Sequence, residues 1–392
     1  MKTKNIYLMY AIAFLQGMVF YGPVATLYRQ AKGISILQIT LIESISLILC
    51  LILEFPWGIL ADKIGYKKTI LICNALYFLS KIIFWKAENF SAFLFERIII
   101  SIVIAGLSGV DTALLYLSCE EPQPAQDANP PQSQNKSHQV FGIWNSLQTA
   151  GLLIASLVFS AAADGDYSLA ALFTVLSYGL AALLSLALTE VRPSKKEHSF
   201  RNFVRFFKQT ATDKYILLFL IGIALLNETH QTVTVFLNQL QYVKCGLSSS
   251  AIGYIYTAVT VAGLCSAFSS KITGKLGTAS TVFFLFTAAA AACLLLAFTA
   301  SAWLSVLGIL ILRISFSLFQ PLQTELQNRQ ITGNSRATVL SMNAVIIDSV
   351  GAGTNIAFGS LAQHNLTHAF LFGAALCIAG GLFLRLWYMQ EC

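Results

Sequence analysis

Long apolar runs constrain this chain more than any other feature of its sequence. A helix needs about 20 mostly apolar residues to cross a bilayer, and runs of about that length recur throughout the 392 residues. We place them near residues 5–27, 36–60, 67–86, 89–118, 139–163, 168–190, 214–241, 248–273, 278–298, 301–330, 336–362 and 367–388. The sequence therefore predicts an all-α membrane protein with twelve transmembrane helices in two groups of six.

The composition agrees with a chain embedded in lipid. Hydrophobic residues make up 56% of it and charged residues only 11%, whereas a soluble domain carries roughly 25% charged residues. Such a chain lacks the charge that a water-exposed surface needs. It has no G-x-x-x-x-G-K-[ST] nucleotide-binding loop, and no C-x-x-C pair occurs among its 8 cysteines. We therefore expect that ATP is not the direct energy source and that the cysteines form no metal site. We also expect no enzymatic activity and no cofactor.

Basic residues in the loops predict how the chain crosses the membrane. If the N-terminus is cytoplasmic, 18 of the 25 lysines and arginines lie on the cytoplasmic side, 4 lie on the other side, and Lys81, Arg97 and Arg313 lie within spans. We expect a multi-pass protein of the plasma or inner membrane, with both termini in the cytoplasm and no cleavable signal peptide. The net charge of +7 then reflects topology and not nucleic-acid binding.

Two hydrophilic stretches interrupt the spans and divide the chain. Residues 119–139 are rich in Pro and Gln and predict a mobile loop. We expect a bundle over residues 1–190, a cytoplasmic linker over 191–213 with a short amphipathic helix near 200–208, and a second bundle over 214–392. The halves also resemble each other, because "AADGDYSLAALF" (162–173) aligns with "AQHNLTHAFLF" (362–372), which indicates a duplication.

The loop between the second and third spans carries a family motif. "GILADKIGYKK" (Gly58–Lys68) resembles the motif G-x-L-A-D-R-x-G-R-K of the major facilitator superfamily. "EFPWG" (Glu54–Gly58), "SGVDTALLY" (Ser108–Tyr116) and "RATVLS" (Arg336–Ser341) resemble further signatures of its bacterial, drug-efflux-like branch. The resemblance implies two pseudo-symmetric six-helix bundles that transport a solute by alternating access.

Five residues of this loop form a predicted conformational latch between helix ends. The glycines permit a tight turn and close helix approach, the acid accepts hydrogen bonds or pairs with a base, and the lysines hold the loop in the cytoplasm. A loop that only sets topology would explain the lysines but not the acid with its glycines. The latch residues are Gly58, Asp62, Gly65, Lys67 and Lys68.

Ionisable residues within spans are costly and therefore mark candidate sites. Arg97 lies where the family often has an arginine linked to proton movement, and it shares a helical face with Asp111 if the fourth span is one helix. The alternative for each of these residues is a structural ion pair or hydrogen bond between helices. The proton-coupling candidates are Glu54, Arg97, Asp111, Glu228 and Asp348.

Polar side chains at helical spacing predict a cavity that contains water. Stripes run along the seventh and tenth spans, which line the central cavity in the superfamily, and lipid cannot satisfy their hydrogen bonds. Hydrogen bonds between helices are the alternative explanation. The cavity candidates are Gln16, Tyr21, Asn227, His230, Gln231, Thr234, Asn238, Arg313, Ser317 and Gln320.

Together these features favour a secondary active transporter. Resemblance to drug exporters predicts proton-coupled efflux of an amphipathic compound. A proton-coupled importer of a polar nutrient and a lipid translocase remain alternatives, since the amides suit a hydroxyl-rich or zwitterionic ligand. Charges within several spans argue against a scaffold or receptor that transports nothing. The expected partners are a small-molecule substrate, protons and membrane lipids, with no nucleic acid, and we expect a monomer.

Overall fold

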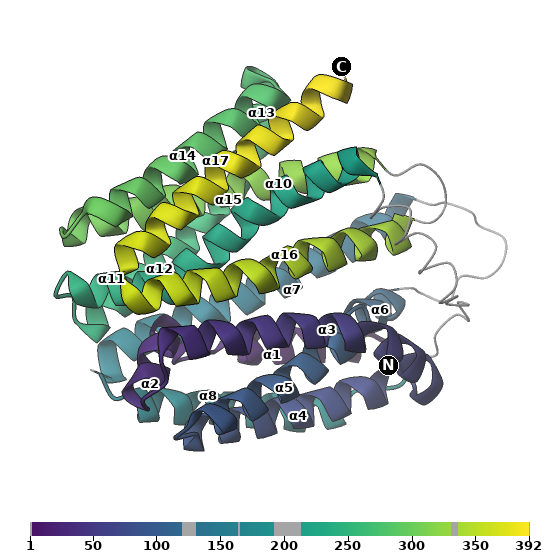
Figure 1. The fold of residues 1–392 in the computed structure, drawn as a ribbon. Coiled ribbons are helices and arrows are strands. Elements are labelled where there is room, and N and C mark those ends of the chain that lie inside the picture. The colour runs from purple at the N-terminus through teal and green to yellow at the C-terminus, as the bar shows by residue number, and fades with distance from the viewer. Residues whose placement is uncertain (1, 120–130, 164, 192–212, 331–335, 392) are drawn as a thin grey trace. The chain divides into compact units, whose positions relative to one another are not determined.

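The computed structural model describes residues 2–119, 131–163, 165–191, 213–330 and 336–391 (Figure 1). Every element in these ranges is helical. They contain 12 segments that are long and apolar enough to cross a membrane. The predicted fold class is therefore confirmed. A helix satisfies its backbone groups internally, which is why apolar spans of this length fold as helices in lipid.

The described chain forms two compact units, which we consider separately. The first contains residues 1–23 and 49–198, and the second contains 24–48 and 199–392. Helix α3 (Ile36–Ile64) contributes to both, because its start belongs to the second unit and its end to the first. The expected division into two sequential bundles stays a prediction, and the linker residues 192–212 lie outside the described residues.

The first unit is built around helices α1 and α4. Helix α1 packs on α7 and α8, and α4 packs on α5 and α8. The contact of α1 with α7 is close, because a Cβ at Gly17 or at Gly151 would overlap the backbone of the other helix. The elements of this unit are α1 (Lys2–Gly17), α4 (Tyr66–Lys86), α5 (Phe90–Leu107), α6 (Val110–Cys119), α7 (Pro131–Val158), the π-helix η2 (Phe159–Ala163) and α8 (Tyr167–Leu186).

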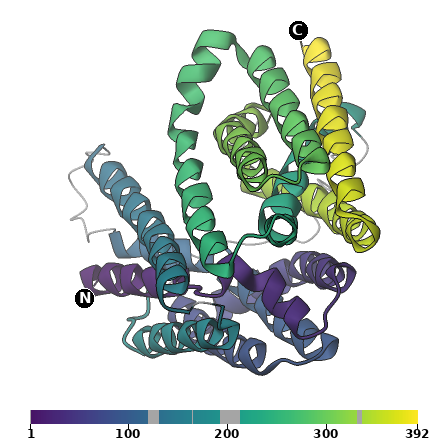
Figure 2. The ribbon, with the colours of Figure 1, turned by 90° about the vertical axis from the view of Figure 1, so that its left-hand side faces the viewer.

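The second unit has helix α17 between α14 and α10. The yellow α17 lies beside the green α14 in both views (Figures 1 and 2), and it also packs on α10. The elements of this unit are α2 (Ala25–Ala31), α10 (Lys214–Gln231), the π-helix η3 (Thr232–Leu237), α11 (Asn238–Lys244), α12 (Ser249–Ala262), the 3-10 helix η4 (Gly263–Phe268), α13 (Ser269–Leu276), α14 (Thr278–Phe298), α15 (Ala302–Arg329), α16 (Arg336–His364) and α17 (Leu366–Glu391). The short 3-10 helix η1 (Gly22–Val24) precedes α2.

Several spans are not continuous α-helices. The fourth span breaks between α5 and α6, where Gly109 has a φ of 77°. The seventh contains a π-helix and the eighth a 3-10 helix. Helix α7 begins at Pro131, so the end of the loop predicted for residues 119–139 is helical instead. Proline suits the first position of a helix, because its φ is already helical and its missing N–H would have no partner there.

Equivalent positions in the two halves have the same local structure. Helices α4 and α14 both have 21 residues, and each follows a glycine with positive φ, 95° at Gly65 and 81° at Gly277. In each helix a threonine hydroxyl, Thr69 or Thr281, donates to the carbonyl of that glycine, at 2.9 and 2.8 Å. These matched turns support the duplication that the sequence indicates.

Candidate functional site

A buried arginine and histidine meet in the second unit. Arg313 of α15 places Nη1 3.3 Å from Nε2 of His230 on α10. A guanidinium only donates hydrogen bonds, so in this contact the Nε2 atom accepts and the imidazole is neutral. The imidazole also stacks on Phe316, with centroids 3.9 Å apart and an interplanar angle of 7°. Both cavity candidates therefore contact each other within the helix bundle.

The 3-10 helix η4 provides the space for this arginine. A Cβ at Gly263 would lie 2.5 Å from Nη2 of Arg313 and 3.1 Å from its Cζ. Only glycine lets the backbone of the eighth span approach the guanidinium so closely. Nε of Arg313 is buried and has no hydrogen-bond partner among the described residues. The guanidinium is thus held by one neighbour and retains a donor that a ligand could use.

Glu228 lies on a different side of α10 from His230. Residues two positions apart on a helix point roughly 200° apart, and Glu228 accordingly contacts α16, where a Cβ at Gly351 would lie 2.5 Å from its carboxyl carbon. Asp348 is near enough to interact with it electrostatically. Glu228 and His230 therefore make two separate contacts on different sides of α10. Just after α10, Thr232 of η3 donates to Asn355 of α16 at 2.6 Å.

The polar stripe of the seventh span does not form one continuous face. A π-helix adds a residue per turn, so positions after η3 are rotated by about 100° relative to those before it. Before η3, Asn227 is half-buried, its Oδ1 has no partner among the described residues, and Gln231 is exposed. After it, Gln241 donates to the Thr299 carbonyl and to Ser305, at 3.1 and 3.0 Å. Gln241 fits the alternative explanation, a hydrogen bond between helices.

The other cavity candidates of this unit are divided between buried and exposed positions. The Thr234 hydroxyl donates to the His230 carbonyl at 2.8 Å and lies 3.3 Å from Nε2 of that histidine. Asn238 is buried, and its Oδ1 accepts from the next backbone N–H. On α15, Ser317 is buried and Gln320 is exposed. Thr234 therefore belongs with the Arg313–His230 contact, and the others stay predictions.

A second buried cation, Lys81, lies in the first unit. The sequence places it within a span, but it is not among the site residues predicted from the sequence. Lys81 is 5% exposed. Its Nζ lies 3.1 Å from the hydroxyl of Tyr21, and it lies over the rings of Tyr77 and Tyr178, at 5.2 and 5.0 Å from the ring centroids. Cation–π contacts of this kind stabilise a buried ammonium. The signal was present in the sequence, because Tyr77 precedes Lys81 by one helical turn.

Polar neighbours surround this lysine and bring in another predicted residue. Gln16 donates to Asn74 at 2.8 Å, and the hydroxyl of Tyr178 donates to the Gln16 carbonyl at 2.7 Å. Arg97 and the fully buried Glu96 of α5 interact electrostatically with Tyr77. Gln16, Tyr21 and Arg97 therefore belong to one polar cluster, in which Glu96 is a member that sequence reasoning did not find.

The remaining proton-coupling candidates of the first unit lie near the break in the fourth span. Asp111 is in the first turn of α6 and accepts from the Thr112 N–H at 2.6 Å. Because α5 and α6 are separate helices, the reason for placing Arg97 and Asp111 on one face no longer holds. The Glu54 carboxyl is within reach of the Ser108 side chain at the same break.

Two residues of the predicted latch, Gly65 and Lys67, contact the segment after the sixth span. A Cβ at Gly65 would lie 2.7 Å from the carboxylate of Glu190, which also accepts from the Lys67 N–H at 3.2 Å. The prediction that Gly58 permits close helix approach is wrong. A Cβ at this position would meet no described atom within 4 Å, so close packing does not explain this glycine. The side chain of Asp62 lies outside the described residues, as do those of Arg336 and Ser341. Lys68 is exposed.

These contacts define what the second unit can do chemically. We call Arg313, His230, Thr234 and Phe316 the arginine cluster. It offers a guanidinium, a neutral imidazole and a hydroxyl beside an aromatic ring, which suits a ligand with an acceptor or anionic group. Glu228 and Asp348 form a separate carboxyl pair on the other side of α10, and a carboxyl pair can take up a proton.

Comparison with known proteins then gives the fold a context. The family model described as Major Facilitator Superfamily matches residues 6–354. A structure of a mutant of the nucleoside transporter NupG has a TM-score of 0.81 at 16% identity, with 97% of this chain and 99% of that chain covered. A POT family transporter in complex with 5-aminolevulinic acid has a TM-score of 0.75 at 14% identity, covering 98% and 96%.

A third structure, a bacterial homologue of the human lysosomal transporter Spinster in an inward-facing and unoccupied conformation, has a TM-score of 0.69 at 16% identity, covering 98% and 94%. At such identities the likeness establishes the fold alone. None of the curated protein sequences compared with the chain matches it significantly. The matches do not single out a drug-efflux branch.

Proposed function

Because this chain belongs to the major facilitator superfamily, we propose that it is a proton-coupled carrier of a small polar solute that bears an anionic or strongly accepting group. The chain is a multi-pass membrane protein and a secondary transporter of small molecules, not an enzyme. The proposal adds the class of solute, the coupling ion and the residues that serve each, with transport by alternating access.

The observation that carries the proposal is that Arg313 has no charge-compensating partner among the described residues. A cation at this depth of a span is costly unless it has partners. Its one described hydrogen-bond partner is a neutral imidazole, its Nε has no described partner, and no salt bridge joins it to a described carboxylate. An anionic group of a solute would supply the missing charge and acceptors, and an uncharged amphipathic molecule would not.

The carboxyl pair on α10 and α16 supports proton coupling. Glu228 is 8% exposed and packs against the backbone of α16 at Gly351, close to Asp348. A proton taken up by either carboxyl would remove the repulsion between them and change how α16 rests on α10. Since α10 also carries His230, a change at this contact can reach the arginine cluster through one helix.

The structures that share this fold include carriers of polar solutes. Among them are a nucleoside transporter and a POT family transporter in complex with 5-aminolevulinic acid. We infer that a solute of comparable size and polarity suits the arginine cluster. Efflux of an amphipathic compound, which the sequence resemblance favours, is the second candidate, and the direction of transport stays a prediction. So do the lipid-translocase alternative, the cytoplasmic termini and the latch at Gly65.

A ligand screen tests the class of solute. The purified protein is heated with nucleosides, amino acids, short peptides, monocarboxylates and amphipathic cations, and stabilisation is measured. We expect an anionic or zwitterionic polar solute to raise the melting temperature, because a ligand that binds only the folded state stabilises it. Arg313→Gln should weaken its binding roughly 10-fold or more, whereas Arg329→Gln, which alters an exposed arginine of the same helix, should not. Stabilisation by amphipathic cations alone would overturn the proposal.

Transport in proteoliposomes tests the coupling ion and the direction. The stabilising solute is placed inside or outside the proteoliposomes and a pH gradient is imposed. Accumulation of the solute should then depend on the size of the proton gradient. Glu228→Gln should abolish the dependence on the gradient while leaving solute exchange without a gradient intact. A variant that still concentrates the solute would remove Glu228 from coupling. Accumulation with the proton flow identifies import, and accumulation against it identifies efflux.

A further inference from the structure

An apolar groove runs along α14 and α17, away from the arginine cluster. Near the start of α14 and the end of α17 it opens into a cavity of about 440 Å³. A second cavity of about 250 Å³ continues it along the same two helices, and both cavities are lined by Phe283, Gly381 and Arg385. The two cavities therefore form one groove with a basic residue where they join.

The second cavity, between α14 and α17, is narrow and apolar enough to hold a hydrocarbon chain. Its lining includes three small residues, Ala290 and Ala291 on α14 and Gly381 on α17. Exposed apolar side chains such as Leu294 and Leu382 form its rims. The lining extends on α14 from residue 279 to residue 294, which is roughly 22 Å at 1.5 Å per residue. One leaflet of bilayer hydrocarbon is about 15 Å thick, so an acyl chain fits within this length.

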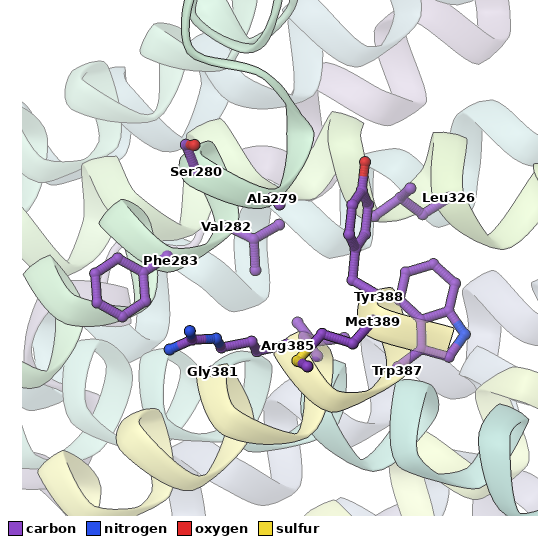
Figure 3. Close-up of a pocket in the computed structure, with 11 residues that line it drawn as sticks. Ala279, Ser280, Val282, Phe283, Leu326, Gly381, Arg385, Trp387, Tyr388 and Met389 are labelled. Carbon is purple, nitrogen blue, oxygen red and sulfur yellow. The ribbon is translucent and has the colours of Figure 1, made fainter. Parts of the chain in front are cut away.

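The end of the groove has the chemistry of a headgroup site. Figure 3 shows Arg385 extending from α17 across the groove toward Phe283 of α14. Ser280 lies in the first turn of α14, and Trp387 and Tyr388 line the same end (Figure 3). Aromatic residues of this kind are typical of the membrane–water interface. The N-terminus of α14 adds partial positive charge beside the arginine.

The charge of this end of the groove is positive. Among the described residues that line either cavity, Arg385 is the only charged one. Lys271 and Lys275 are exposed on α13, the helix that leads into α14. Glu325 precedes the lining residue Leu326 in the chain, but its negative charge is paired with Arg329. A negatively charged headgroup would therefore meet complementary charge.

We propose that this groove binds one anionic phospholipid from the membrane leaflet that surrounds the start of α14 and the end of α17. One acyl chain lies between α14 and α17, and the headgroup phosphate accepts hydrogen bonds from Arg385. A guanidinium suits this role because its donors match phosphate oxygens in pairs. The site is separate from the arginine cluster and does not depend on the transported solute.

Native mass spectrometry of the full chain in a neutral detergent tests the site. With added phosphatidylglycerol we expect one lipid to stay bound, in preference to phosphatidylcholine. Arg385→Gln should lower the bound fraction at least roughly 5-fold, since a charge-assisted hydrogen bond is lost. Lys244→Gln, at an exposed lysine of the same unit outside the groove, should retain the lipid. Equal retention by Arg385→Gln would overturn the proposal.

Three further measurements distinguish lipid binding from a folding defect and from other occupants of the groove. Ala291→Phe fills the channel but leaves Arg385 in place, and it should weaken binding of phosphatidylglycerol with long chains but not of a short-chain form. Inorganic phosphate alone should leave the melting temperature unchanged, and an equal rise with phosphate would assign the site to a free anion. A dimer that dissociates in Ala291→Phe would assign the groove to a second copy of this chain.

Discussion

The contact between Gly263 and Arg313 offers a direct test of the arginine cluster. The backbone of Gly263 is helical, with φ −60° and ψ −24°, so alanine is compatible with it. Its Cβ would nevertheless lie 2.5 Å from Nη2, whereas nonbonded carbon contacts are favourable near 3.5 Å. The guanidinium must therefore move by roughly 1 Å, and we expect this shift to lengthen its 3.3 Å contact with His230 beyond hydrogen-bonding distance.

The effect of Gly263→Ala on the free energy of unfolding should have opposite signs with and without the Arg313 side chain. Where Arg313 is already alanine, Gly263→Ala should stabilise the protein by about 0.5–1 kcal/mol, because glycine loses more backbone entropy on folding. In the native background the displaced guanidinium loses a hydrogen bond worth about 1.5–3 kcal/mol. The net change there should be a loss of roughly 1–2 kcal/mol. A double-mutant cycle should therefore report a coupling of about 1.5–3 kcal/mol.

Reversible unfolding in mixed micelles, followed by tryptophan fluorescence, measures all four corners of this cycle. The binding constant of a stabilising solute is measured on the same variants and should weaken in Gly263→Ala even though residue 263 contributes no polar side-chain atom. If the two substitutions are additive within about 0.5 kcal/mol, the guanidinium is free to move. Arg313 would then not be held in place by the eighth span.

Three other substitutions probe contacts of known geometry. Gly151→Ala should cost about 3 kcal/mol or more in the same unfolding assay, because its Cβ would overlap the backbone carbonyl of Phe14, which cannot rotate away; a loss below 1 kcal/mol would contradict the close packing of α1 on α7. Gln239→Leu removes the Oε1 that accepts from the Thr26 N–H at 2.9 Å, so amide exchange in α2 should accelerate about 10-fold, whereas Gln239→Glu keeps the acceptor and should not change it. Lys81→Met should lower stability by about 1–3 kcal/mol through the lost hydrogen bond and ring contacts, with partial recovery in Lys81→Arg, and an unchanged melting temperature would argue against the tyrosine cage.

The number and position of the spans could be predicted from the sequence because they depend on a local property. A bilayer requires a certain length of apolar helix, and that length is visible in any stretch of sequence without knowledge of its neighbours. The repeat was visible for the same reason: α8 begins at Tyr167 and α17 at Leu366, inside the aligned segments. The buried Ala170 and Ala369 occupy matching positions there.

The predicted faces failed where the helix departs from its regular period. The stripe from Asn227 to Gln241 assumed 3.6 residues per turn, and the π-helix η3 rotates its second half. The pairing of Arg97 with Asp111 assumed one helix, and Gly109 ends it. Neither interruption has an unambiguous local signal, because a π-helix is set by packing on neighbouring helices.

Contacts between distant segments were also beyond the sequence. Glu190 follows the sixth span, and nothing in its local sequence indicates that its carboxylate lies at Gly65, where the third span begins. Lys81 differs, because a lysine in an apolar span needs partners, and a tyrosine one turn away was a usable sign. Its other two tyrosines, Tyr21 and Tyr178, come from the first and sixth spans and required the fold.

The irregular segments and the buried polar groups occur together, and this has a physical reason. Non-helical backbone at membrane depth is tolerated only where protein or a water-filled cavity covers it. The 3-10 helix η4 lies against Arg313, and the π-helix η3 begins two residues after His230. Regular helices would satisfy more backbone hydrogen bonds, so these interruptions are retained at a cost. That cost is explained if the segments shape a site for a polar solute, which is why the arginine cluster, and not the longer polar stripe, is the part of the second unit to test first.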